Sequence, residues 1–140
     1  MTNLQETLTF IGNIATPYHS TEACPCNISS DGPLCEITLY DEFTQGLQGL
    51  CKGDDILILY WLAEADRNQV EQYSSRQNAL IGTFALRSPH RPNPIGAAVL
   101  TIEEMYDATI LIRGIDCLNN TQLIDIKPAI LKEVLTNSEK

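Results

Sequence analysis

Apolar and polar positions alternate along several short stretches of the chain, a pattern typical of β-strands with one buried face. The sequence predicts strands at residues 7–11, 35–40, 55–62, 80–86, 95–102, 109–115 and 123–126. The stretch 55–62 is a continuous apolar run, as expected of a strand that is buried on both faces. Pro128 ends the last predicted strand.

Helical patterns are fewer. Residues 42–50 place Phe43, Leu47 and Leu50 on one side at helical spacing, although two glycines weaken this helix, and residues 129–135 fit one or two helical turns. Many strands with few helices between them predict a mainly β fold, an antiparallel sheet that curls or closes into a barrel. No Gly-x-Gly-x-x-Gly motif follows a strand, so the common dinucleotide site is not expected.

Length and composition predict a single globular domain over residues 1–140, with its core at about residues 8–130. Apolar residues make up 44% of the chain. No apolar run approaches the roughly 20 residues that span a bilayer. The first six residues lack the basic and apolar regions of a signal peptide. We therefore expect a cytoplasmic protein with no membrane partner.

The charge balance is strongly acidic. Nine Lys and Arg face eighteen Asp and Glu, which gives a net charge of −9. A field of this sign repels polyphosphates, so binding of nucleic acid should be weak or assisted by a partner. The basic residues are clustered, however, because Arg67, Arg76, Arg87 and Arg91 follow one another closely.

Five cysteines form an odd set, which argues against a disulfide framework in a cytosolic chain. Cys24, Cys26 and Cys35 have a faint resemblance to metal-ligand spacing but lack a second pair of ligands. We expect buried or incidental thiols and no metal. A cysteine-based metal or redox protein is the alternative.

Residues 87–96, with the sequence Arg-Ser-Pro-His-Arg-Pro-Asn-Pro-Ile-Gly, form what we call the central loop. Its three prolines fix their φ angles at about −65°, so the loop is stiff before any ligand binds. Arg87 and Arg91 carry planar guanidinium groups that suit a carboxylate or phosphate, and Asn93 adds an amide. The loop predicts a site for a small anionic or zwitterionic ligand. The alternative is a rigid turn with solvated arginines.

A second polar stretch, residues 116–128, lies around the last predicted strand, and we call it the closing motif. Asn119 and Asn120 favour a tight turn with positive φ. Asp125 and Lys127 point to the same face of their strand, since side chains alternate along it. The alternative here is an ordinary hairpin with an exposed ion pair.

Three stretches resemble the motifs of one known family. Residues 84–96 resemble the central signature of the TrmO (TsaA-like) family of tRNA methyltransferases. Residues 11–18, Ile-Gly-Asn-Ile-Ala-Thr-Pro-Tyr, look like that family's opening motif, and residues 116–128 look like its closing motif. The three matches occur in the family's order and cover most of the chain.

The resemblance implies a β-barrel-like methyltransferase that uses S-adenosylmethionine and acts as a homodimer. It implies methylation of the N6 atom of threonylcarbamoyladenosine in tRNA, or of a related nucleoside or small molecule. Arg87 and Arg91 would then serve the methionine carboxylate or a substrate phosphate. The cofactor-binding residues that this resemblance predicts are Arg87, Arg91, Asn93, Asp116, Thr121, Pro25, Cys26 and Asn27.

The chain departs from the family pattern at several points. Residues 25–27 are Pro-Cys-Asn where the family has Pro-Arg-Gln, and residues 119–122 are Asn-Asn-Thr-Gln where it has Asp-Gly-Thr-Pro. A histidine common in the strand at residues 60–63 is absent, and the C-terminal domain of longer members has no counterpart. A non-catalytic module that binds S-adenosylmethionine or a nucleotide is therefore the alternative function.

Methyl transfer from a sulfonium is an in-line displacement, so an enzyme mainly aligns the reactants and excludes water. It needs no nucleophile triad, and the sequence contains none. A general base would help with a weakly nucleophilic acceptor nitrogen. The candidates are Asp125, His90 and Asp116.

Overall fold

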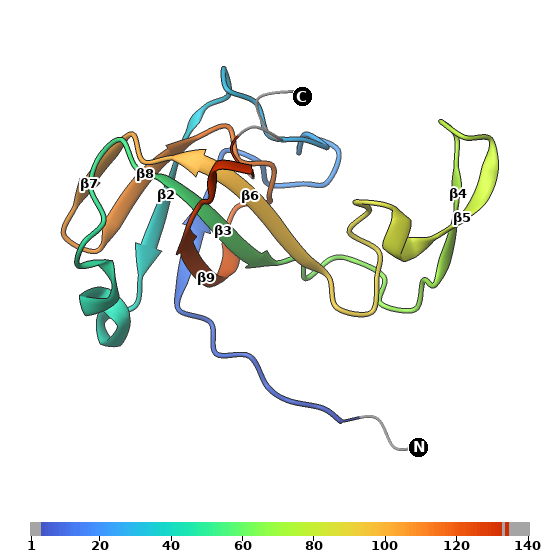
Figure 1. The fold of residues 1–140 in the computed structure, drawn as a ribbon, viewed down its shortest axis with the longest axis horizontal. Helices are drawn as coiled ribbons and strands as arrows, with labels where there is room; N and C mark the ends of the chain where they lie inside the picture. Colours follow the sequence, from blue (N-terminus) through green and yellow to red (C-terminus); the bar gives the residue numbers. More distant parts are fainter. Residues whose placement is uncertain (1–3, 133, 135–140) are drawn as a thin grey trace.

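A curled antiparallel sheet forms the body of the protein (Figure 1). The structure is a computed structural model that describes residues 4–132 and 134. The strands of the main sheet lie in the order β6-β3-β9-β1-β2-β8-β7, and every neighbouring pair is antiparallel. They span Gly12–Ala15 (β1), Leu34–Leu39 (β2), Asp55–Trp61 (β3), Ile95–Thr101 (β6), Glu104–Tyr106 (β7), Thr109–Arg113 (β8) and Thr121–Pro128 (β9). Cα atoms of β6 and β8 approach within 8 Å although four strands separate them in the sheet, so the sheet curls toward a barrel. The predicted fold class is confirmed.

The predicted strand at residues 7–11 is wrong. Residues 4–10 run outside the sheet as an extended segment (Figure 1), the Ile11 amide donates to the Leu123 carbonyl, and strand pairing begins at Gly12. There the chain passes between β2 and β9, and a Cβ on Gly12 would lie 2.4 Å from the carbonyl oxygen of Thr38. The glycine therefore allows β1 to enter the centre of the sheet.

The predicted strand at residues 80–86 is also only partly right. It is divided into β5 (Ala79–Gly82) and the 3-10 helix η2 (Thr83–Ala85). β5 pairs with β4 (Glu71–Ser74), which the sequence pattern did not predict, and this hairpin is separate from the main sheet. The hairpin ends at the fully buried Thr83, whose amide donates the last hydrogen bond across it, to the Val70 carbonyl.

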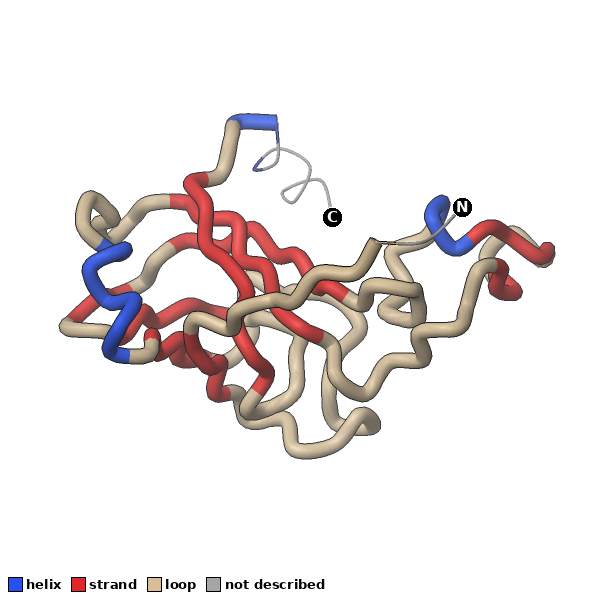
Figure 2. Tube along the Cα trace, turned by 90° about the horizontal axis from the view of Figure 1, so that it is seen from below, coloured by secondary structure: helices blue, strands red, loops and turns tan. Residues whose placement is uncertain are grey.

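Helical structure lies outside the sheet, with η1 (Asp41–Leu47) at one end of the molecule and η2 beside the hairpin at the other (Figure 2). The helix predicted at residues 42–50 is thus a shorter 3-10 helix, whose Leu47 is buried and whose Phe43 packs on the core. Leu131, Lys132 and Val134 are helical, while Glu133 and Leu135 lie outside the described residues. Across the described part of the chain, no helix is long and apolar enough to cross a membrane.

The core lies inside the curl of the sheet. Its fully buried side chains come from alternate positions of the strands, as the two-residue period requires. They include Ile14, Ile37, Ile56, Ile58, Ile110, Ile112 and Leu123. Tyr60 continues the inward row of Ile56 and Ile58 on β3 and is 3% exposed.

Residues 62–94 connect β3 to β6 and extend away from the body, carrying the β4–β5 hairpin (Figure 1), and we call this segment the arm. Residues 87–94 of the central loop make up most of the returning half of the arm. Because β3 and β6 pair along their whole length, the arm leaves and re-enters the body at one point, where Trp61 pairs with Ile95.

Candidate functional site

The opening and closing motifs are joined by hydrogen bonds. The Thr16 hydroxyl donates to the Cys117 carbonyl at 2.9 Å, and the Thr16 amide donates to Asn119 Oδ1 at 3.0 Å. The Asn119 amide in turn donates to the Tyr18 carbonyl at 2.7 Å. Two motifs about a hundred residues apart in the sequence therefore form one unit.

Tyr60 joins this unit to the central loop. Its hydroxyl donates to Asp116 Oδ1 at 2.6 Å, and its ring covers Gly96, the last residue of the loop. A Cβ on Gly96 would lie 2.2 Å from Tyr60 Cε2. Burial, followed by the charge of Asp116 and the hydrogen bond to it, raises the pKa of the Tyr60 phenol far above its ordinary value, so Tyr60 is a hydrogen-bond donor at neutral pH.

Arg87 and Arg91 of the central loop have different surroundings. Arg87 is exposed, donates to the Ala97 carbonyl at 3.3 Å, and lies close enough to Tyr60 for its charge to oppose the rise of that pKa. Arg91 is half-buried, and its Nη1 donates to the carbonyls of Leu86 and Ser88, both at 2.9 Å. Arg91 therefore fixes the shape of the loop, whereas the charge of Arg87 acts on the Tyr60 phenol.

Asn93 lies on the arm side of the loop. Its Oδ1 accepts a hydrogen bond from Arg67 Nη2 at 3.4 Å, while Arg67 Nε donates to the Pro92 carbonyl at 2.8 Å. The Arg67 guanidinium stacks on Trp61, 5.2 Å from the ring centroid. These contacts hold the outgoing and returning halves of the arm together.

His90 is held by backbone contacts. Its Nδ1 accepts a hydrogen bond from the Asp66 amide at 3.0 Å, and its carbonyl accepts one from Gln72 Nε2 at 2.6 Å. The proton of a neutral ring then lies on Nε2. His90, one of the candidate bases, therefore lies in the arm, and its Nδ1 already accepts the hydrogen bond from the Asp66 amide.

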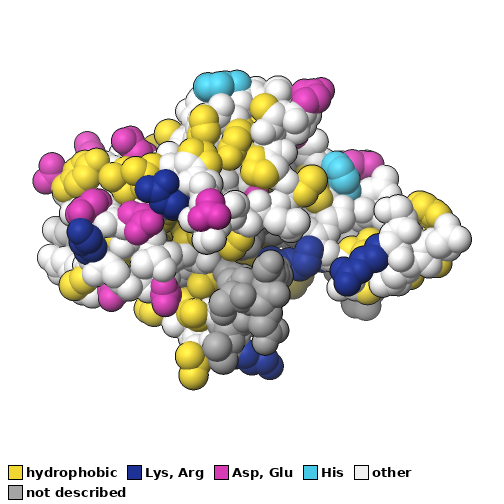
Figure 3. Space-filling view, turned by 90° about the horizontal axis from the view of Figure 1, so that it is seen from above, with side chains coloured by type: hydrophobic (Ala, Val, Ile, Leu, Met, Phe, Trp, Pro, Cys, Tyr) yellow, Lys and Arg dark blue, Asp and Glu magenta, His cyan; other side chains and the backbone are white. Residues whose placement is uncertain are grey.

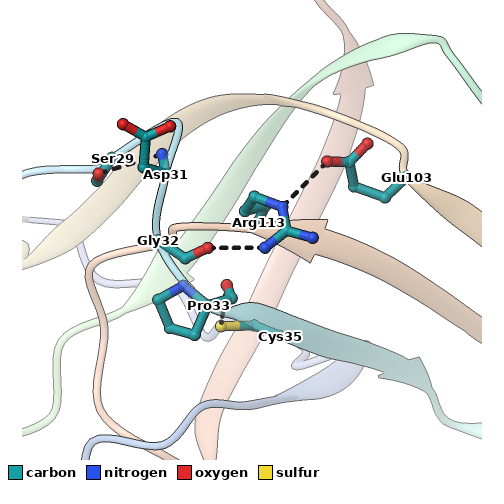
Figure 4. Close-up of polar contacts among 7 residues, drawn as sticks. All are labelled: Ser29, Asp31, Gly32, Pro33, Cys35, Glu103 and Arg113. Atoms are coloured by element: carbon teal, nitrogen blue, oxygen red, sulfur yellow. Dashed lines mark hydrogen bonds and ion pairs between the residues drawn. The ribbon is translucent and has the colours of Figure 1, made fainter.

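Residues 25–27 lie in a long loop between β1 and β2, in which Pro25 is half-buried and Cys26 and Asn27 are exposed. The preceding Cys24 lies near Asp116, whose charge adds to the effect of burial in raising the pKa of its thiol. The far end of the loop is held by Arg113 of β8, which donates from Nη1 to the Gly32 carbonyl at 3.1 Å and pairs with Glu103 at 3.4 Å (Figure 4). The loop is thus brought to the closing motif.

Thr121 and Asp125 have other contacts. The Thr121 hydroxyl donates to the Leu118 carbonyl at 2.6 Å and closes the Asn119–Asn120 turn, where Asn120 has the predicted positive φ of 68°. Asp125 pairs with Lys127 at 2.8 Å, as predicted from strand alternation. Asp125 also lines a groove of about 460 Å³ beside η1, with Leu39 and Phe43 among its other walls, so it is placed apart from Asp116.

All five cysteines are free thiols, and burial raises the pKa of Cys24, Cys35 and Cys117. Within residues 4–132 and 134, no group of three or more His, Cys, Asp or Glu side chains could hold a metal ion.

Sequence reasoning missed four residues that organise this site: Thr16, Tyr60, Arg67 and Gln72. One signal was present for Tyr60. It ends an inward row of isoleucines with a polar group, and a buried phenol requires a partner. The other three act through contacts between distant segments, which the sequence pattern does not encode.

The joined motifs present a carboxylate that accepts a hydrogen bond from a phenol, and the charge of the Arg87 guanidinium acts on that phenol. Opposite charges held close together suit a zwitterion, because each end of such a ligand finds its complement. No activated nucleophile is part of the arrangement.

The curled antiparallel sheet, with its opening, central and closing motifs joined at one place, defines a ligand-binding β domain. The chain belongs to the TrmO family, since the model of the tRNA-methyltransferase O N-terminal domain matches residues 13–132.

Proteins that are similar to this chain include bacterial and archaeal examples. The probable S-adenosyl-L-methionine-binding protein VirR of Rhizobium radiobacter is 39% identical over 121 residues, which cover 86% of this chain and 69% of VirR. An S-adenosyl-L-methionine-binding protein of Archaeoglobus fulgidus is 32% identical over 117 residues, 84% of each protein. The crystal structure of TrmO from Pseudomonas aeruginosa superposes with a TM-score of 0.73 at 25% identity and covers 91% of this chain. This chain spans only 57% of that TrmO chain.

Proposed function

We propose that the protein binds S-adenosylmethionine and transfers its methyl group. The observation that carries the proposal is the hydrogen bond from Tyr60 to Asp116 where the family's three motifs join, with the charge of Arg87 acting on that phenol. The relatives named as S-adenosyl-L-methionine-binding proteins support the choice of ligand.

The residues of the site fit this cofactor. S-adenosylmethionine has a zwitterionic amino-acid end and ribose hydroxyls, and it supplies an electrophilic methyl group on a sulfonium. Arg87 offers guanidinium donors for a carboxylate, and Asp116 offers a carboxylate for amino or hydroxyl groups. Arg91 and the three prolines keep the loop in shape, so less entropy is lost on binding.

Isothermal titration calorimetry with S-adenosylmethionine and S-adenosylhomocysteine tests the proposal. We expect both compounds to bind to the wild-type protein and to bind at least about tenfold more weakly to Arg87→Ala, which loses a charge-assisted contact. Lys52→Ala is the control, because it also removes one positive charge, from an exposed residue of the body that pairs with Glu104. Absence of binding to folded wild-type protein would refute the proposal.

For the methyl acceptor we propose the N6 atom of threonylcarbamoyladenosine in tRNA. The resemblance of the three motifs to the tRNA methyltransferases supports this acceptor. The test is transfer of labelled methyl groups to tRNA that carries the modification, compared with tRNA that lacks it. Labelling of neither RNA, together with cofactor binding, would favour the second candidate, a non-catalytic binding module, which the names of the relatives also fit.

We also propose that two copies assemble through the arm. Val70, Tyr73, Leu80 and Phe84 are each more than 60% exposed, and Tyr73 and Leu80 are cross-strand partners on one face of the hairpin. Large apolar side chains gathered on one face are typical of an interface. Sedimentation equilibrium should give the mass of two chains for wild type and of one chain for Leu80→Glu/Phe84→Glu. A wild-type mass of one chain would refute the dimer.

A further inference from the structure

We propose that Tyr60 is a positioning residue of the cofactor site, one that holds the Asp116 carboxylate in its binding orientation. This inference rests on the proposed function, because it assigns a role to a residue of that same site. Tyr60 touches two of the three motifs and belongs to none of them.

The Tyr60 phenol is buried at the end of an inward-facing row of side chains. The inward positions of β3 are Ile56, Ile58 and Tyr60, and the first two need only apolar surroundings. A phenylalanine would fill the third position equally well. The hydroxyl is therefore unnecessary for packing, and leaving it unpaired inside the protein would be unfavourable. Its function lies in the bond that it makes.

The acceptor of the hydrogen bond from the Tyr60 hydroxyl is a carboxylate. The Tyr60 hydroxyl reaches Asp116 Oδ1 at 2.6 Å, the short distance expected when a hydroxyl donates to a carboxylate. Asp116 is half-buried between Ile115 and Cys117, whose side chains are at most 1% exposed. Both neighbours are anchored in the core, so the backbone is fixed, and the phenol restrains the Oδ1 atom of the carboxylate.

Gly96, at the end of the central loop, lies against the Tyr60 ring. Any side chain there would collide with the Tyr60 ring, because the hypothetical Cβ lies within 2.6 Å of three ring atoms. The ring thus lies directly on the end of the central loop, and Arg87 of that loop is close enough to act on the phenol electrostatically. Tyr60 consequently sets the position of Asp116 relative to Arg87, the two charges proposed to hold the zwitterion.

A second tyrosine provides a matched control. The Tyr40 hydroxyl also makes a side-chain hydrogen bond of 2.6 Å, to Gln122 Oε1, at an exposed position. Tyr60→Phe and Tyr40→Phe each delete one oxygen and one hydrogen bond of the same length. The first change removes a contact to Asp116, whereas the second removes an exposed contact to Gln122.

The experiment measures the Kd of S-adenosylhomocysteine by calorimetry for wild type, Tyr60→Phe, Asp116→Asn, the double variant and Tyr40→Phe, with unfolding curves for each. We expect Tyr60→Phe to weaken binding about tenfold while unfolding stays cooperative, and Tyr40→Phe to bind as wild type. Because Tyr60 acts through Asp116, the double variant should bind no more weakly than Asp116→Asn alone.

The outcomes are distinguishable. A wild-type Kd for Tyr60→Phe beside a weakened Asp116→Asn would overturn the positioning role and leave the proposed function standing. Effects of the two changes that simply multiply in the double variant would also overturn it, because the residues would then act independently. Wild-type protein that binds neither S-adenosylmethionine nor S-adenosylhomocysteine would remove the proposed function, and this inference with it.

Discussion

At the scale of single residues, the pair Tyr60 and Gly96 decides the geometry of the site. Tyr60 on β3 pairs with Gly96 on β6, and the Tyr60 ring fills the space that a side chain on residue 96 would need. Protein interiors are packed densely enough that such a space cannot accept even one added carbon without a shift. The central loop therefore ends in glycine for a steric reason, since the position needs no unusual backbone angle.

Gly96→Ala should destabilise the protein by about 1–3 kcal/mol, because the added methyl group displaces the Tyr60 ring from Asp116. Urea unfolding measures the change. Gly82→Ala is the matched control, since Gly82 has a φ of −62° and nothing lies within 4 Å of the added Cβ. Equal stability of the two variants would contradict the ring contact.

The raised pKa of Tyr60 predicts a loss of stability in alkali. An unfolded tyrosine releases its proton at about pH 10, whereas the folded phenol retains it, so the stabilising contribution is complete below about pH 10 and is lost as the pH rises above that value. Between about pH 8 and pH 11, urea unfolding should therefore show a larger loss for wild type than for Tyr60→Phe. Identical losses would mean that the phenol ionises in the folded protein as it does in water.

At the scale of elements, the periodicity of the sequence predicted most of the sheet but not its connections. The strands β2, β6, β8 and β9 follow from alternating or β-branched patterns, because each has one face in the core. β3 follows from its continuous apolar run, although only its alternate positions Ile56, Ile58 and Tyr60 are buried and the other face is half-buried. The pairing of β1 with β9, and hence the contact of Thr16 with Cys117, joins residues about a hundred positions apart, which no local pattern encodes. The motifs of the candidate site were visible in the sequence, but the phenol that joins two of them was not.

Thr16→Val tests the contact between the opening and closing motifs. Valine keeps the shape of threonine, so the change removes the buried hydroxyl and its bond to the Cys117 carbonyl, and should cost about 1–3 kcal/mol of unfolding free energy. Thr44→Val is the control, because the exposed Thr44 hydroxyl bonds only within η1, and its loss should stay within about 0.5 kcal/mol. Similar effects of the two changes would show that the contact adds nothing to stability.

At the scale of the whole molecule, charge is distributed unevenly. The arm, residues 62–94, carries four arginines against three carboxylates, whereas the rest of the chain carries five basic and fifteen acidic residues. On the face in Figure 3, acidic side chains lie mostly over the body with some basic ones among them, and further basic side chains lie where the arm leaves it. A polyanion should therefore meet repulsion from the body and approach along the arm.

From this uneven distribution of charge we predict that RNA binding depends more on the arm than on the body. Arg76 lies exposed in the turn between β4 and β5, and Lys52 lies exposed on the body, paired with Glu104 at 2.6 Å. Arg76→Glu and Lys52→Glu change the net charge by the same amount, so any difference between them reports position. Fluorescence anisotropy with a labelled RNA hairpin should show weak wild-type binding that falls with salt and is weakened several-fold more by Arg76→Glu than by Lys52→Glu. If both variants weaken binding equally, RNA responds only to total charge, and the arm has no special part in its approach.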